Sequence, residues 1–299
     1  MSSVTALVTG GTGFVGSRLV RALLARGAKV RVVSSGTGSR ERVGDVSAQV
    51  AWFAPTDSGL DQACSGVTHF FHFAVAYDRA DISDETIDYV NVALPLRVMA
   101  RLQAHAPAAT CVLGDTFFRK FPADATRQVR YTRAKSELAR RLADPSQGID
   151  LRRALLQIEQ VYGPGDAYTK VLPRVTRQLL AHEPRIPLTH GEQQRDFIHV
   201  DDVVAATLTV AHAAWSGLAV VECGTGVGTP VREVFERLHS LTASASVLGF
   251  GDLPPDQSIA SSTACLDWLR QHGWHAQVAL DKGLADLVVD VVHRLDPRS

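Results

Sequence analysis

Two residues spaced one helical turn apart carry the clearest chemical signal in this sequence. Tyr131 and Lys135 form a Y-x-x-x-K element, and on a helix positions i and i+4 share one face. An ammonium group beside a phenol favours the phenolate and lowers the pKa of the tyrosine. Tyr131 is therefore a candidate general acid or base near neutral pH. Taken alone, the same spacing is also common on exposed helix faces.

A glycine-rich turn near the N-terminus indicates where the phosphates of a ligand would bind. The segment at residues 9–16 reads TGGTGFVG and fits the pattern T-G-x-x-G-x-x-G. It lies between an apolar β-branched run and a helical pattern, which is the context that gives such glycines meaning. Glycine permits close backbone approach, and a helix start presents N–H groups to a diphosphate. The residues expected to bind a dinucleotide here are Gly10, Gly13, Phe14, Val15 and Gly16.

The end of the second predicted strand bears on which dinucleotide binds. In NAD-binding proteins this strand usually ends in an acidic residue that binds the adenosine ribose hydroxyls. Here the strand at residues 30–33 is followed by Ser34 and Ser35, and Arg40 lies in the loop beyond. Hydroxyl groups and a guanidinium suit a 2′-phosphate, so the sequence favours NADP(H) over NAD(H). The alternative is that Arg40 is only a solvated loop charge.

The elements that must position these residues alternate between strand and helix. Apolar strands are predicted at 4–8, 30–33, 50–53, 69–74, 110–113 and 150–158, with helices at 14–25, 86–105 and 131–142. Near-continuous apolar strands separated by helices predict a parallel sheet covered on both faces, in a doubly wound α/β (Rossmann) fold. Beyond it the sequence predicts a strand at 220–222 and helices at 201–213, 231–241 and 280–292, whereas residues 166–191 show weak periodicity.

These elements predict two domains. A cofactor-binding domain occupies residues 1–165 and is completed by about 196–223. A small C-terminal α/β substrate domain is formed by residues 166–195 and 224–299.

Composition excludes several classes of protein. In 299 residues, 31 Lys and Arg balance 31 Asp and Glu, which argues against a dedicated nucleic-acid binder. A hydrophobic content of 45% is too high for a disordered chain. No apolar run approaches the roughly 20 residues of a membrane span, and no secretory signal is visible. Dispersed cysteines, and histidines without ligand partners, predict a cytoplasmic protein without a metal site.

Several further segments together resemble the extended short-chain dehydrogenase/reductase family, its NAD-dependent epimerase/dehydratase group. The segment HFAVA at 72–76, which includes Ala74, resembles the family's fourth-strand segment beside the cofactor. The segments YGPG at 162–165 and RDFIHVDD at 195–202 resemble two later family signatures. The resemblance covers essentially the whole chain. It implies a nicotinamide cofactor, a nucleotide-sugar substrate and a homodimer joined through the helices near 86–105 and 131–142.

The resemblance also implies roles for single residues. Thr116 matches the Ser or Thr whose hydroxyl bonds the reacting carbonyl or alcohol, and Tyr131 matches the proton donor or acceptor. Lys135 matches the residue that holds the nicotinamide ribose and tunes the tyrosine. Arg195 matches a contact to the substrate diphosphate, and the alternative for it is a salt bridge to a neighbouring aspartate. Gln160 stands where many relatives have an asparagine near the substrate.

At several positions the sequence departs from the family pattern, and these positions limit which of the family's reactions it could catalyse. Phe117 and Phe118 follow Thr116, where dehydratases carry acidic or basic helpers, so a 4,6-dehydratase is excluded. Ala54 stands where the family usually has an aspartate that contacts adenine, and it is open whether Asp57 replaces it. The segment at 188–198 resembles 4-ketoreductases acting on CDP- or dTDP-4-keto-6-deoxyhexoses. We therefore expect NADPH-dependent reduction of a sugar C4 ketone in deoxysugar biosynthesis.

Three other functions stay open. The first is an NAD-dependent nucleotide-sugar epimerase of the same family. The second is a non-catalytic NADP-binding regulatory protein on the same fold. The third is a reductase of small or aromatic ketones, if Phe117, Phe118 and Phe121 line an apolar pocket and are not simply core residues.

Overall fold

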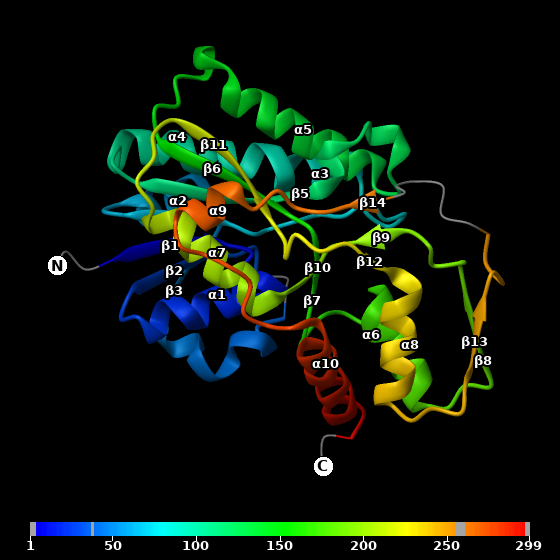
Figure 1. Cartoon of the computed structure of the whole chain (residues 1–299). Helices are drawn as coiled ribbons and strands as arrows, with labels where there is room; N and C mark the ends of the chain where they lie inside the picture. The colour runs from blue at the N-terminus through cyan, green and yellow to red at the C-terminus, as the bar shows by residue number, and fades with distance from the viewer. Residues whose placement is uncertain (1–3, 37–38, 255–260, 297–299) are drawn as a thin grey trace. The chain divides into compact units, whose positions relative to one another are not determined.

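A computed structural model describes residues 4–36, 39–254 and 261–296, and the chain divides into two compact units (Figure 1). The first unit comprises Met1–Ile158 and Val204–Val221. The second comprises Glu159–Val203 and Glu222–Ser299. The sequence predicts that the chain passes between its two domains near residues 165, 196 and 223.

A seven-stranded sheet forms the centre of the first unit. Its strand order is β11-β6-β5-β4-β1-β2-β3, and the pairings described among β1 to β6 are all parallel. The strand order reverses at β1, which lies between β2 and β4, and open α/β sheets bind ligands at such a switch point. The predicted doubly wound fold is confirmed. The strands are β1 (Thr5–Thr9), β2 (Lys29–Val33), β3 (Val50–Phe53), β4 (His69–His72), β5 (Thr110–Thr116), β6 (Arg152–Ile158) and β11 (Leu218–Cys223).

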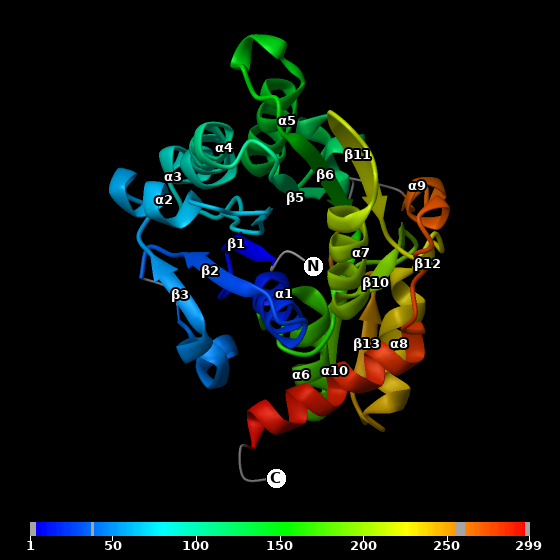
Figure 2. The ribbon, with the colours of Figure 1, turned by 90° about the vertical axis from the view of Figure 1, so that its left-hand side faces the viewer.

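Helices cover both faces of this sheet. Figure 2 shows α2, α3, α4 and α5 on one side of it and α1 and α7 on the other. The α1 residues Leu19, Val20 and Leu23 are buried at helical spacing, so one face of α1 packs inward. The bounds are α1 (Phe14–Ala25), α2 (Asp57–Cys64), α3 (Asp84–Asp88), α4 (Leu94–His105), α5 (Val129–Ala143) and α7 (Val200–His212), with short 3₁₀ helices at Glu41–Gln49, Phe117–Lys120, Ala123–Ala125 and Pro145–Gln147.

The long helical pattern predicted at 86–105 is one continuous helical stretch with a π-helical turn inside it. The Ser83 hydroxyl caps α3 by accepting a hydrogen bond from the Thr86 amide. The π-helical turn (Tyr89–Ala93) then leads into α4. The Asn91 side chain within it donates to the carbonyls of Ala76 at 2.8 Å and Ile87 at 2.9 Å. Asn91 thereby ties the helix to the loop that follows β4.

In its described residues, the second unit contains three small sheets and four helices. Its core is formed by apolar side chains of α6, α8 and α10, including Leu172, Val234 and Leu284. The strands pair as β7 (Gln160–Tyr162) with β10 (Phe197–His199), β8 (Arg185–Leu188) with β13 (Val247–Phe250), and β9 (Gln194–Arg195) with both β12 (Thr229–Pro230) and β14 (Ser261–Ser262). The helices are α6 (Val171–Leu180), α8 (Val231–Leu241), α9 (Asp267–Gln271) and α10 (Leu280–Leu295).

Helix α6 lies where the sequence pattern suggests only weak periodicity. Its buried face is nevertheless regular, since Leu172, Val175, Thr176 and Leu179 follow helical spacing. Pro173 lies in the first turn, where the absent N–H group removes no intrahelical hydrogen bond. The proline-rich and basic composition of this segment hides the helix.

Three general properties follow from the described residues. None of the helices described combines the length and apolar character needed to cross a membrane. Among the residues at 4–36, 39–254 and 261–296, no group of three His, Cys, Asp or Glu side chains is arranged to hold a metal ion. All four cysteines lie within these ranges and are free thiols, three of them buried.

Candidate functional site

The glycine turn after β1 is closed so tightly that side chains are excluded from it. Gly10 has a φ of +74°, and a Cβ placed there would lie 2.3 Å from the backbone nitrogen of Ala74. A Cβ at Gly16 would lie 2.1 Å from the Gly10 carbonyl oxygen. The Gly13 amide donates to that same oxygen at 2.9 Å. The turn therefore brings bare backbone from β1, α1 and the segment after β4 together.

The first turn of α1 presents amide groups that no side chain caps. Gly13 occupies the N-cap position without a side-chain hydrogen bond, and no acidic residue stands in the first turn. Phe14 and Val15 begin the helix and are half-buried. An uncapped helix start beside a switch point suits a diphosphate. The residues present thus fit the dinucleotide expected from the sequence.

The residues predicted to contact the adenosine ribose lie at the end of β2. The Ser34 amide donates to the Phe53 carbonyl at 2.9 Å, and the Ser34 hydroxyl accepts from the Gly36 amide at 3.2 Å. Ser35 is exposed. Arg40 is also exposed, and its guanidinium lies over the Trp52 ring, 3.9 Å from the ring centroid. Arg40 lies in the loop after β2, but its side chain stacks on Trp52 of β3. It is therefore not a loop charge without contacts.

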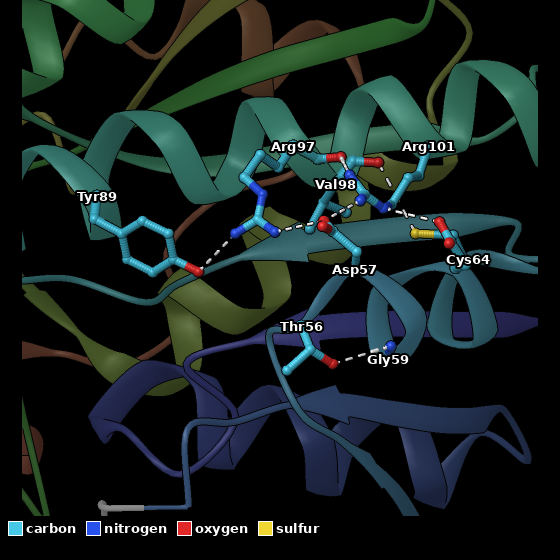
Figure 3. A network of polar contacts seen from close by, with 9 residues as sticks. Thr56, Asp57, Gly59, Cys64, Tyr89, Arg97, Val98 and Arg101 are labelled. Atoms are coloured by element: carbon cyan, nitrogen blue, oxygen red, sulfur yellow. Dashed lines mark hydrogen bonds and ion pairs between the residues drawn. The ribbon is translucent and has the colours of Figure 1, made fainter.

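Asp57, which follows the third strand, forms ion pairs with two arginine side chains. Its carboxylate forms ion pairs with Arg97 at 2.7 Å and with Arg101, both on α4 (Figure 3). The Thr56 hydroxyl caps the start of α2 by accepting from the Gly59 amide at 3.2 Å. Asp57 thus links α2 to α4.

Three predicted residues gather at the carboxyl end of β5 and on α5. β5 continues to Thr116, beyond the predicted end at residue 113, because Thr116 is still in register with Ile158 of β6. Tyr131 and Lys135 lie on successive turns of α5, and all three side chains are buried. The Thr116 hydroxyl acts on the Tyr131 phenol so as to lower its pKa. The Thr116 hydroxyl also accepts from the Phe118 amide at 3.3 Å.

Burial controls the protonation of this pair. Lys135 donates from Nζ to the Gly114 carbonyl at 2.7 Å, and Nζ lies 5.8 Å from the centroid of the Tyr131 ring. Burial lowers the pKa of Lys135 to about 8. Burial also raises the pKa of Tyr131 well above its ordinary value, and the neighbouring Tyr77 and Asp115 add to this. The expected lowering of the tyrosine pKa by Lys135 is wrong here, because desolvation of the phenolate outweighs any help from the ammonium.

Sequence reasoning missed two groups beside this cluster. The ring of Tyr77, in the loop after β4, lies 5.1 Å from that of Tyr131 between centroids. Asp115, directly before Thr116, is buried and pairs with Arg119 at 2.7 Å. The only signal for either was position: Tyr77 follows the HFAVA segment, and Asp115 precedes Thr116 on the same strand.

The two aromatic residues after Thr116 contact each other. The ring centroids of Phe117 and Phe118 are 4.4 Å apart. Phe117 is buried, whereas Phe118 and Phe121 are half-buried. The two side chains that follow Thr116 in the chain are therefore apolar and carry no proton-transfer group.

Gln160 and Arg195 belong to the second unit. Gln160 lies on β7, and its backbone N–H donates to the backbone carbonyl of Asp196 at 3.0 Å. Arg195 lies on β9 with 8% of its surface exposed, and its Nη1 donates to the Gln194 carbonyl at 2.8 Å. The buried Asp196 carboxylate accepts from the amide and hydroxyl of Thr225 at 2.7 and 2.6 Å. Asp196 thus binds the segment that follows β11.

Comparisons with known proteins show the family of this chain. The sequence profile of the NAD dependent epimerase/dehydratase family matches residues 6–224. CDP-abequose synthase of Salmonella muenchen is 28% identical over 94% of this chain and 96% of its own length. The dTDP-4-dehydro-6-deoxy-D-allose reductase of Streptomyces bikiniensis is 28% identical over 68% of this chain and 71% of its own. The solved structure of MoeE5 in complex with UDP-glucose and NAD superposes with a TM-score of 0.79 at 26% identity, covering 98% of this chain and all of that one.

Proposed function

Because the chain belongs to the NAD dependent epimerase/dehydratase family, we propose that it reduces the C4 ketone of a nucleotide-linked 4-keto-6-deoxyhexose with NADPH. The observation that carries this is the buried cluster of Thr116, Tyr131 and Lys135 next to apolar Phe117 and Phe118. The first three residues supply what ketone reduction needs. The two phenylalanines cannot assist an elimination.

The proposed roles follow from hydrogen-bonding capacity. Tyr131 is neutral at neutral pH because burial raises its pKa, so it holds a proton to donate to the carbonyl oxygen. Thr116 accepts from the Phe118 amide and keeps its own O–H available to support the developing alkoxide. Lys135 places a positive charge near the phenol as that proton leaves. When bound, NADPH supplies the hydride for the carbonyl carbon.

The proposed cofactor preference rests on the end of β2. Serines at positions 34 and 35 put no carboxylate at the end of β2 that would repel a 2′-phosphate. In the loop that follows, the Arg40 side chain stacks on Trp52 of β3. A guanidinium held on an aromatic face can still bond phosphate oxygens through its edge. Gly10, Gly13 and Gly16 would hold the diphosphate at the start of α1.

The substrate class rests on relatives and on two residues of the second unit. Two curated relatives are named for deoxysugars linked to CDP or dTDP. Arg195 is proposed to contact the substrate diphosphate and Gln160 to lie near the sugar. The proposed assembly is a homodimer through the helical stretch that ends with α4 and through α5, which light scattering of the purified chain would test.

The direct test is consumption of NADPH with CDP- and dTDP-4-keto-6-deoxyglucose. Turnover with either sugar, and formation of the alcohol, supports the proposal. No turnover with either sugar contradicts it.

An NAD-dependent epimerase is the second candidate, because MoeE5 is similar over nearly the whole chain and was solved with NAD. An epimerase keeps its cofactor and returns the hydride that it removes. NAD released by denaturing the purified protein, together with conversion of a nucleotide sugar without net NADPH use, would favour this function over the reductase.

A further inference from the structure

A buried carboxylate lies directly behind the candidate catalytic cluster and has no part in the proposed mechanism. Asp115 exposes 1% of its side-chain surface. Its Oδ2 accepts a hydrogen bond from Nε of Arg119 at 2.7 Å and forms an ion pair with Nη2 of the same side chain at 2.7 Å. Its Oδ1 is buried and has no hydrogen-bond partner among the described residues. Burying a carboxylate this completely is costly unless it is paired, and here only one oxygen is bonded.

The chain places this carboxylate between the two residues that the catalytic pair touches. Gly114, on one side of Asp115, accepts the hydrogen bond of Lys135. Thr116, on the other side, carries the hydroxyl that acts on the pKa of Tyr131. In a buried environment charges act on one another more strongly than in water. Burial raises the pKa of Asp115, whereas the charges of Arg119 and Lys135 favour its carboxylate form. A negative charge held at this point acts on both members of the pair.

We propose that Asp115, held in place by Arg119, is a positioning residue that sets the electrostatic field at Lys135 and Tyr131. The proposal rests on the proposed function for what Lys135 and Tyr131 do, but the ion pair itself stands on the geometry alone. Asp115 touches neither reacting group. It acts by stabilising the ammonium form of Lys135 and disfavouring the phenolate of Tyr131, so that each member of the pair keeps its proton before reaction.

The charged and titratable groups around Lys135 come from β4, β5, the turn after β5 and α5, and they have opposing effects. Asp115 raises the pKa of Lys135, whereas Arg119, on the turn after β5, lowers it. His72 on β4 is neutral, because burial and the charge of Lys135 hold its pKa well below the ordinary value. On α5 itself the neighbour is Tyr131, which burial keeps protonated. Removing Asp115 and removing Arg119 should therefore move Lys135 in opposite directions.

The protonation of Lys135 can be followed by NMR without crowding from other signals, because the chain has only five lysines: Lys29, Lys120, Lys135, Lys170 and Lys282. In protein grown with ¹³C- and ¹⁵N-labelled lysine, the side-chain NMR signal of Lys135 is the one lost in Lys135→Met. Its titration in the full-length protein should centre near pH 8. In Asp115→Asn it should shift down by about one pH unit or more, as expected on losing a close opposite charge. In Arg119→Gln it should shift up.

Two further variants separate a field effect from damage to the fold. Asp115→Glu keeps the carboxylate and should bring the titration back towards that of the wild type. Asp124→Asn neutralises an exposed carboxylate on the 3₁₀ helix Ala123–Ala125 and should leave the titration unchanged. An unshifted Lys135 in Asp115→Asn, or shifts of the same sign in Asp115→Asn and Arg119→Gln, would overturn the proposal.

The readout does not depend on turnover. If keto-sugars are not reduced, the proposed function fails while the lysine titration still decides the role of Asp115. If they are reduced but the titration does not move, the function stands and this inference fails.

Discussion

The phenol of Tyr131 is buried and keeps its proton, and this decides what a single-residue change should do. Tyr131→Phe removes the proton that the carbonyl oxygen must receive but keeps the ring in place. General-acid catalysis contributes on the order of 10²–10⁴-fold to rate, so kcat should fall by about that factor. NADPH affinity, measured by fluorescence titration, should stay near that of the wild type. Retained full activity would remove Tyr131 from the mechanism.

Arg40 tests cofactor choice at the same scale. In Arg40→Ala the guanidinium over Trp52 is lost, and with it a charge-assisted contact to the proposed 2′-phosphate. Such contacts are worth about 1.5–3 kcal/mol, so the Kd for NADPH should rise at least about tenfold while that for NADH changes little. Calorimetric titration of both cofactors measures this. Equal loss for both cofactors would contradict a role in binding the 2′-phosphate.

At the scale of elements, the β1–α1 turn depends on the absence of a side chain at Gly16. A methyl group there would meet the Gly10 carbonyl oxygen at 2.1 Å. Relieving such an overlap costs about 1–3 kcal/mol and moves the backbone. Gly16→Ala should therefore weaken cofactor binding by about tenfold or more. The matched control is Gly44→Ala, because a Cβ at Gly44 would meet nothing within 4 Å and should leave binding unaltered.

A buried histidine at the amino end of β4 should make the free energy of unfolding depend on pH. His69 lies against His212 of α7, with ring centroids 5.4 Å apart. Burial, aided by the charges of His212 and Arg152, lowers the pKa of His69 from 6.5 to about 4. The unfolded chain therefore binds the proton more readily between these values, so stability is fully present above about pH 6.5 and is lost as pH falls towards 4.

Urea unfolding at two pH values measures this effect. The free energy of unfolding should be lower at pH near 5 than at pH near 7.5, and His69→Phe should show a smaller difference between the two. A His69→Phe protein with the same pH dependence as the wild type would assign the effect to other groups.

Elements were predicted well where the pattern was periodic and less well where it was not. Helices α1 and α8 have the predicted bounds, because their apolar positions repeat without interruption. Helix α6 was missed because Pro173 and several basic residues hide its apolar face.

For the candidate site, the i,i+4 spacing predicted that Tyr131 and Lys135 lie together, but it could not reveal that both are buried. Burial reverses the expected direction of the tyrosine pKa. Asp115 and Arg119 were missed because i,i+4 charge pairs are common on surfaces, and sequence does not distinguish a buried one.

At the scale of the whole molecule, a chain with equal numbers of acidic and basic residues is proposed to bind two polyanionic ligands. The positive potential required is local. In the first unit it comes from the uncapped start of α1, from Arg40 and from Lys135, and in the second from Arg195. Global neutrality is therefore compatible with the proposed ligands, and binding of both should weaken with salt only modestly compared with a nucleic-acid binder.

The central claim is that a hydride moves once, from NADPH to C4 of a nucleotide-linked keto-sugar, with the proton supplied by Tyr131. The most direct measurement uses NADPH deuterated at the transferred position together with CDP-4-keto-6-deoxyglucose and its dTDP counterpart, followed by mass spectrometry and NMR of the sugar. One deuterium at C4 of the product is expected for each NADPH oxidised. A product without deuterium, or conversion of the sugar with no NADPH consumed, would contradict it.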